Sequence, residues 1–122
     1  MSEQPSRAAI VDLGTNTFNL LVFETKDNGI EVVYSSEVPV FLAKGGIEKG
    51  LIAPDALERG MISLRNHANT ARAHGATDIR AFGTSALRNA RNANELAKRA
   101  ELELGIVISI IPGDQEAELI LA

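Results

Sequence analysis

The chain has 122 residues, no cysteine and a formal net charge of −4. Its length corresponds to about one domain, and the missing cysteines exclude a disulfide framework and thiolate metal sites. The negative charge argues against a nucleic-acid surface, which needs clustered Lys and Arg. The apolar runs are far shorter than the roughly 20 residues of a membrane helix. Residues 1–7 are polar, contain no apolar signal region and are expected to be frayed, so the cytoplasm is the expected location.

The first third of the chain predicts three consecutive strands. Residues 8–13 and 18–24 form apolar runs, and a more polar run follows at 30–40. The intervening Asn28-Gly29 pair is a strong hairpin signal because both residues tolerate positive φ. These short connections predict an antiparallel meander.

The middle of the chain predicts one long helix after a glycine-rich loop at 43–53. Proline suits the first helical position, so the helix is expected to begin near Pro54 and to stop at Gly75. Its buried face carries apolar residues at helical spacing, namely Leu57, Met61, Leu64, Ala68 and Ala71. We expect His67 and His74 at its solvated surface, because no third metal ligand accompanies them.

A short strand at 78–82 and a further helix are predicted next. Asn92 or Asn94 is expected to cap this helix, and Gly105 to end it. Its buried side is expected to carry Leu96, Ala100 and Leu104.

The β-branched run at 106–111 is typical of a central strand with both faces covered. Residues 115–122 begin another helix, inside which the sequence stops, so we expect more chain to follow. The order β-β-β-α-β-α-β-α predicts an α/β layer domain in which crossover strands extend a hairpin sheet.

The segment between the first two strands, residues 12–17, contains donors suited to a phosphoryl group. Gly14 permits a tight turn, and Thr15, Asn16 and Thr17 supply hydroxyl and amide donors. A carboxylate at a strand end, here Asp12, can hold Mg²⁺ directly or through water. A polar hairpin turn with satisfied side chains explains the same spacing, and the spacing alone leaves the two interpretations even.

A second polar segment, residues 83–92, follows a strand and leads towards a helix, where open α/β sheets bind ligands. Thr84 and Ser85 can donate to an oxyanion, and Arg88 can grip phosphate as a fork. Spacing alone favours a simpler interpretation, a capped loop with Arg88 in solvent.

A third segment, residues 113–118, places acidic residues at a predicted helix N-terminus. A glutamate there can act as a general base or orient a water. Acidic residues also stabilise helix N-termini, and spacing alone favours that interpretation.

Together, in this order, the three segments resemble the exopolyphosphatase and guanosine-pentaphosphate phosphatase (Ppx/GppA) family. Residues 9–21 follow the family's apolar strand and its Asp-x-Gly-Ser/Thr-Asn-Ser/Thr loop. Residues 84–92 follow its Thr-Ser/Asn-Ala-Leu-Arg-x-Ala-x-Asn segment. Residues 113–117 follow its Gly-x-Glu-Glu-Ala segment, with Gln115 in place of the first Glu. The resemblance implies a ribonuclease-H-like domain of the actin-like ATPase superfamily, with a mixed five-stranded sheet.

The resemblance also implies an activity, a cofactor and residue roles. The activity is hydrolysis of inorganic polyphosphate or guanosine pentaphosphate, by metal-assisted attack of water on a terminal phosphoryl group. Asp12 would hold Mg²⁺, and Glu116 would be the catalytic carboxylate that activates water. The phosphate-binding residues would be Gly14, Thr15, Asn16, Thr17, Thr84, Ser85 and Arg88.

The chain departs from the family pattern in several places. The usual Arg-Leu-Gly-x-Gly context is replaced by Phe41-Leu42-Ala43-Lys44-Gly45, and loss of the cation predicts weaker polyphosphate binding or a different substrate choice. The family's Asp-x-Gly-Gly-Gly-Ser loop is absent. Residues 8–122 are therefore expected to be the N-terminal lobe of a two-lobed phosphatase, inactive alone. Its expected partners are the substrate and the missing C-terminal lobe of the same protein, and a homodimer is compatible with this picture.

Two other functions remain open at this point. One is a non-catalytic module that senses phosphate or nucleotide. The departures from the family pattern at Phe41 and Gln115 leave this function open. The other is a lobe of a related actin-like ATPase or kinase, although the continuation Asn16-Thr17-Phe18 favours the phosphatase branch.

Overall fold

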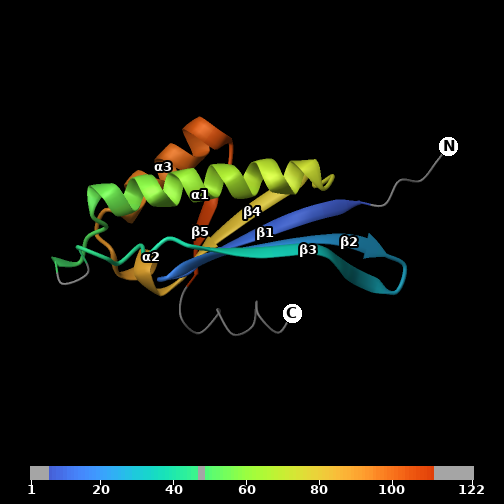
Figure 1. Cartoon of the computed structure of the whole chain (residues 1–122), viewed down its shortest axis with the longest axis horizontal. Helices are drawn as coiled ribbons and strands as arrows, with labels where there is room; N and C mark the ends of the chain where they lie inside the picture. Colours follow the sequence, from blue (N-terminus) through green and yellow to red (C-terminus); the bar gives the residue numbers. More distant parts are fainter. Residues whose placement is uncertain (1–5, 47–48, 112–122) are drawn as a thin grey trace.

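A computed structural model describes residues 6–46 and 49–111, which form a mixed five-stranded sheet with helices packed on it (Figure 1). The strands are β1 (Arg7–Leu13), β2 (Thr17–Lys26), β3 (Gly29–Pro39), β4 (Asp78–Gly83) and β5 (Ile108–Ile110). Their order across the sheet is β3-β2-β1-β4-β5. The first three strands form the predicted antiparallel meander, whereas β4 runs parallel to both β1 and β5.

The helical elements are α1 (Pro54–Ala73), α2 (Ser85–Asn89), α3 (Ala93–Arg99) and the π-helical turn η2 (Ala100–Leu104). Figure 1 shows α1 and α3 on the same side of the sheet, with α2 at the end where β1 and β4 finish. The short helix α2 is a correction, because the segment was expected to be a loop. Buried Leu87 anchors it, and the amide of Arg88 donates to the Thr84 carbonyl at 2.8 Å.

The core lies between α1 and the face of the sheet that α1 covers. Side chains of β1 and β2 alternate strictly, and the inward set is Ala9, Val11, Leu13, Phe18, Leu20 and Val22. All five apolar residues predicted for the helix face are buried, which confirms the periodicity argument. Full burial of each large apolar side chain contributes about 1.5–3 kcal/mol, so this layer fixes the position of the sheet end that the loops extend.

The β2–β3 hairpin is confirmed, but its turn lies one residue earlier than the Asn-Gly signal suggests. Asp27 and Asn28 form the turn, and Lys26 pairs with Gly29 as the first residue of β3. Gly29 has φ +130°, a conformation that disfavours residues with a Cβ. Glycine is therefore needed at the start of the strand and not inside the turn.

The prediction of a central strand at 106–111 is wrong. β5 spans only Ile108–Ile110 and pairs, among the described residues, with β4 alone. Val107 is 61% exposed and Ile110 is 40% exposed. A β-branched run reports strand propensity but not the number of neighbouring strands. The helix expected at 115–122 lies outside the described residues.

The cap predicted for α3 has a different function. Asn92 occupies the N-cap position without a side-chain cap hydrogen bond. Its Oδ1 accepts from the Ile52 amide at 2.8 Å, and its Nδ2 donates to the Ile52 carbonyl at 3.0 Å. The side chain therefore joins the α3 entry to the loop before α1. Gly105 ends the helical run in the left-handed conformation as predicted.

The expectation of two solvated histidines is wrong for His67, whereas His74 is half-buried. His67 is 3% exposed, three residues after Leu64 on the buried face of α1, and its Nε2 lies 2.9 Å from the Phe18 carbonyl oxygen. His74 follows the last residue of α1, and its ring stacks on Tyr34 with the centroids 4.2 Å apart. No helix in the described ranges is long and apolar enough to cross a membrane.

Candidate functional site

The carboxyl ends of β1 and β4 bring two of the predicted segments together. The parallel register pairs Leu13 with Gly83, so the chain leaves both strands at the same edge of the sheet. The backbone amide and the Oγ1 of Thr84 both approach the Leu13 carbonyl at 3.4 Å, and both donate to it. The segments 14–17 and 84–88 therefore form one continuous wall, at the place where open α/β sheets bind ligands.

The first segment is a tight turn closed on itself. The amide of Gly14 donates to the Thr17 carbonyl at 3.0 Å. A Cβ added at Gly14 would lie 3.0 Å from that same oxygen, closer than ordinary van der Waals contact. Glycine is thus required here by close approach, since Gly14 does not have positive φ. Thr15 and Thr17 are half-buried and Asn16 is exposed at the tip of the turn.

Residues 40–42, which follow β3, run alongside this turn. The Asn16 carbonyl accepts from the amides of Val40 at 2.8 Å and Phe41 at 2.9 Å, and the Thr15 carbonyl accepts from Leu42 at 2.9 Å. Spacing alone did not place this segment at the site, whereas the resemblance to the family linked it to substrate binding. The sequence signal was the departure at Phe41, which lies at the rim of the turn.

Asp12 and Asn19 face each other directly across β1 and β2. Opposed residues of an antiparallel pair lie on the same face, with Cβ atoms about 4.5–5.5 Å apart. That face is the one opposite the α1 core, because the neighbours Val11 and Leu20 point into the core. The Oδ1 of Asn19 is buried and has no hydrogen-bond partner among the described residues.

These two oxygen-bearing side chains fit the needs of Mg²⁺. Mg²⁺ binds through one or two protein oxygens and otherwise keeps water or substrate phosphate. An orphaned buried acceptor beside a carboxylate, Asn19 beside Asp12, is such a donor set. Within the described residues there is no group of three His, Asp or Glu that could hold a metal alone. Sequence reasoning named Asp12 as a candidate metal ligand and did not name Asn19.

Arg88 lies where β4 and β5 end. Its Nη1 donates to the Ile111 carbonyl at 3.0 Å, just past the last residue of β5. The guanidinium of Arg88 therefore lies at the sheet edge where β1, β4 and β5 end. Ser85 is the first residue of α2. Glu116 lies outside the described residues.

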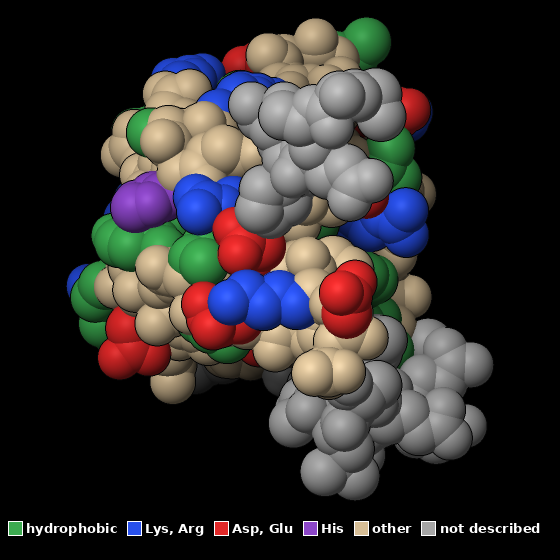
Figure 2. Space-filling model, turned by 90° about the vertical axis from the view of Figure 1, so that its right-hand side faces the viewer, with side chains coloured by type: hydrophobic (Ala, Val, Ile, Leu, Met, Phe, Trp, Pro, Cys, Tyr) green, Lys and Arg blue, Asp and Glu red, His purple; other side chains and the backbone are tan. Residues whose placement is uncertain are grey.

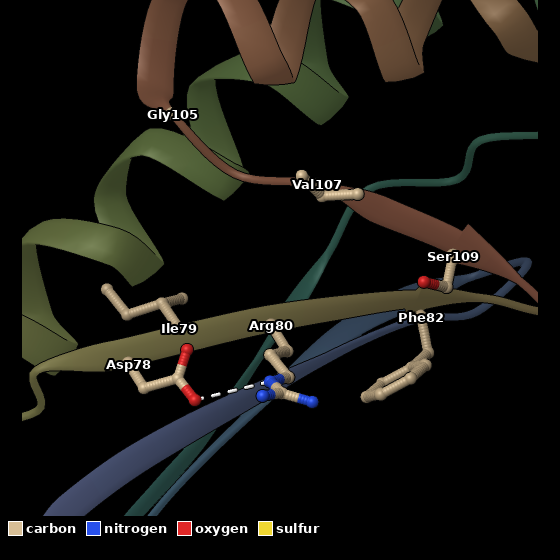
Figure 3. Close-up of a pocket in the computed structure, with 7 residues that line it drawn as sticks. All are labelled: Asp78, Ile79, Arg80, Phe82, Gly105, Val107 and Ser109. Atoms are coloured by element: carbon tan, nitrogen blue, oxygen red, sulfur yellow. Dashed lines mark hydrogen bonds and ion pairs between the residues drawn. The ribbon is translucent and has the colours of Figure 1, made fainter.

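Two depressions lie on the face of the sheet opposite α1. One, of about 440 Å³, is lined by Asn19, Leu20, Leu21, Ser35, Ser36 and Glu37, and adjoins the Asp12–Asn19 pair. The other, of about 360 Å³, lies between β4 and the segment that forms β5 (Figure 3). Figure 3 shows Arg80 ion-paired to Asp78 there, at 3.2 Å. None of the described residues predicted from the sequence for the site lines either depression, and Asn19 is the residue through which the first depression adjoins Asp12.

The opposite end of the sheet has a different charge pattern. Figure 2 looks onto the end that carries the β2–β3 hairpin, and Lys and Arg side chains lie there next to Asp and Glu side chains. Arg7 pairs with Glu24 at 2.9 Å and Lys26 pairs with Glu31 at 3.0 Å. The hydrogen bond that Lys26 donates to Glu31 raises the pKa of Lys26. Cations neutralised in this way do not form a surface for anionic ligands.

Comparisons with known proteins identify relatives of this chain. The model of the Ppx/GppA phosphatase family matches residues 21–122. A guanosine-5'-triphosphate,3'-diphosphate pyrophosphatase of Vibrio cholerae is 36% identical over 112 residues, which are 92% of this chain and 22% of that protein.

Two solved structures are similar throughout. A crystal structure of an exopolyphosphatase from Cytophaga hutchinsonii has a TM-score of 0.89 and 34% identity, over 93% of this chain and 36% of that one. The Aquifex aeolicus member of the Ppx/GppA family has a TM-score of 0.86 and 25% identity, over 93% and 37%. These likenesses confirm the ribonuclease-H-like fold of the actin-like ATPase superfamily.

Proposed function

Since the chain belongs to the Ppx/GppA phosphatase family, we propose that it carries one wall of the phosphate site of a phosphoanhydride hydrolase. The observation that carries this proposal is the pairing of Leu13 with Gly83, which joins two donor-rich segments at one sheet edge. The chain spans 22% of the length of its Vibrio relative. The proposed activity is therefore that of a complete protein, in which this chain is the N-terminal lobe.

The substrate class is a chain of phosphoanhydrides, either inorganic polyphosphate or guanosine pentaphosphate. The turn formed by Gly14, Thr15, Asn16 and Thr17 holds the terminal phosphoryl group. Thr84, Ser85 and Arg88 contact further phosphoryl oxygens, and the Thr84 hydroxyl turns away from the Leu13 carbonyl to do so. Phosphoryl transfer asks little covalent chemistry of the protein, so positioning and charge neutralisation supply most of the rate.

Asp12 holds Mg²⁺ in this proposal, directly or through water, and Asn19 contributes its orphaned amide oxygen. When bound, the ion neutralises charge on the phosphoryl oxygens. The half-buried position of Asp12 at a strand end limits its freedom, which favours one orientation of the carboxylate. Asn19 is held in the same way by its place in β2.

Glu116 acts as the general base. It accepts a proton from the attacking water while the water oxygen forms a bond to the terminal phosphorus. The bridging oxygen leaves with the shortened phosphate chain. A general base contributes typically 10²- to 10⁴-fold to a rate, roughly.

Phosphate release by the complete protein tests the proposal. Release from polyphosphate and from guanosine pentaphosphate is measured with Mg²⁺, for the unchanged protein and for Glu116→Gln. We expect Glu116→Gln to be slower by about 10²-fold or more, and the control Glu118→Gln to retain activity. Equal rates for the unchanged protein and Glu116→Gln would remove Glu116 from its role. Binding of both substrates without any release would leave a sensing module instead of a hydrolase.

A further inference from the structure

Phe41 adopts a backbone conformation that large side chains avoid. Its φ is +52°, and it is the one non-glycine residue with positive φ among those that the structure describes. The left-handed region brings Cβ too close to the following carbonyl oxygen, so glycine would be favoured there. The neighbours Val40 and Leu42 are buried, at 1% and 0% exposure, whereas Phe41 is 50% exposed. Phe41 therefore combines a strained backbone with a half-exposed aromatic ring.

Several hydrogen bonds hold this conformation in place. The Phe41 amide donates to the Asn16 carbonyl at 2.9 Å, which fixes it against the phosphate turn. From α1, the guanidinium of Arg59 donates to the Val40 carbonyl at 2.8 Å and to the Phe41 carbonyl at 3.1 Å. Asp55 accepts from Arg59 at 3.0 Å and orients it, and that hydrogen bond lowers the pKa of Asp55. Strain that the surroundings maintain is typical of functional positions.

An exposed ring beside a phosphate turn discriminates between two kinds of substrate. Inorganic polyphosphate has no planar or apolar group, and the negative face of an aromatic ring does not attract an anion. A nucleobase stacks on such a ring. We propose that Phe41 determines specificity by stacking against the base of a nucleoside polyphosphate, which makes the nucleotide the preferred substrate of this site. This inference rests on the proposed phosphate site and adds a base platform to it.

Equilibrium binding tests the inference without needing turnover. The complete protein, Phe41→Leu and Phe41→Trp are titrated with guanosine pentaphosphate and with inorganic tripolyphosphate, which has no base. Leucine keeps an apolar side chain and removes the ring, and tryptophan keeps a ring. Ile30→Ala is the matched control, because Ile30 is 61% exposed at the hairpin end of the sheet. Thermal unfolding establishes that each variant is folded.

We expect Phe41→Leu to weaken nucleotide binding by about 5- to 150-fold, the range found when a stacking ring is removed. Tripolyphosphate binding should stay within about twofold, and Phe41→Trp should bind the nucleotide like the unchanged protein. Equal loss for both ligands, or loss for neither, would overturn the inference.

The proposed hydrolase function is judged separately, by phosphate release. Base-dependent binding without release supports the platform and removes the hydrolase. Phosphate release together with nucleotide binding that does not depend on Phe41 supports the hydrolase and removes the base platform.

Discussion

The Nε2 atom of His67 lies 2.9 Å from the carbonyl oxygen of Phe18, in a position that is almost completely buried. Phe18 is the first residue after the turn that ends at Thr17, so the contact joins the middle of α1 to that turn. Burial lowers the pKa of His67, an effect that the hydrogen bond to Phe18 opposes only in part. The imidazole is therefore neutral at neutral pH and donates from Nε2.

This lowered pKa predicts a pH-dependent stability. An unfolded His67 titrates near 6.5, whereas the folded one titrates lower, so below that pH the unfolded state binds more protons. The contribution of His67 is fully present above about pH 6.5 and is lost as the pH falls towards the folded pKa. Urea unfolding at several pH values should show a shallower decline for His67→Gln, which cannot titrate. His74→Gln should retain the original decline, and identical curves for all three proteins would refute the argument.

Gly14 gives a second prediction, from the distance of 3.0 Å between an added Cβ and the Thr17 oxygen. Gly14→Ala should displace the turn by a few tenths of an ångström and reduce phosphate binding by about tenfold or more. Gly60→Ala is the matched control, since its added Cβ would meet Leu42 and Phe18 at 3.4 Å or beyond. We expect that control to stabilise α1 by up to about 1 kcal/mol and to leave phosphate binding unchanged. Parallel losses in both variants would contradict the assignment.

The third prediction is that one substitution of Asn19 raises the stability of the protein and weakens its binding of Mg²⁺. Leaving a buried acceptor unsatisfied costs about 1–3 kcal/mol, so Asn19→Leu should raise the free energy of unfolding without metal. We expect Mg²⁺ with phosphate to stabilise the unchanged protein, and the same variant to lose that stabilisation. Ser63→Ala removes the other buried orphan, in α1, and should keep the response to Mg²⁺. A full Mg²⁺ response in Asn19→Leu would exclude Asn19 from the metal site.

Arg59 provides the fourth prediction, because its guanidinium reaches two consecutive carbonyls and Asp55. Arg59→Met should lower the free energy of unfolding by about 1.5–3 kcal/mol, the range for hydrogen bonds to a charged group. Arg59→Lys should restore little, since one ammonium cannot reproduce the planar fork. Hydrogen exchange at the Phe41 amide should accelerate in both variants. Unchanged exchange in Arg59→Lys would show that the fork does not hold the segment.

Local patterns in the sequence predicted most of the fold. The face of α1, its start at Pro54 and the stop at Gly75 follow from helical period and terminus chemistry, and all are found. The meander follows from alternation and a short turn. These features depend on residues a few positions apart, which is the range over which side-chain periodicity acts.

The missed features depend on contacts between distant residues. His67 has a polar side chain, yet it lies on the buried side of α1. The carbonyl oxygen of Phe18, 49 residues away, gives its ring a hydrogen-bond partner there. Asn92 has the chemistry of a cap, but Ile52 competes for its amide across 40 residues. The exposed position of Phe41 depends on Asn16 and Arg59. The sequence therefore named candidate residues where local motifs occur, and did not name Asn19 or residues 40–42 among them, whose places depend on pairing between distant segments.

The parallel pairing of β1 with β4 has a consequence for synthesis of the protein. The meander can form once Pro39 has left the ribosome, but the free edge of β1 waits for residues 78–83. At about 5–20 residues per second, the 38 residues between Pro39 and Asp78 take roughly 2–8 s to emerge. Throughout that time β1 offers unpaired backbone groups and an apolar face to any other extended chain. The nascent protein is thus most exposed to misassembly, and most accessible to chaperones, before its helix α1 is complete.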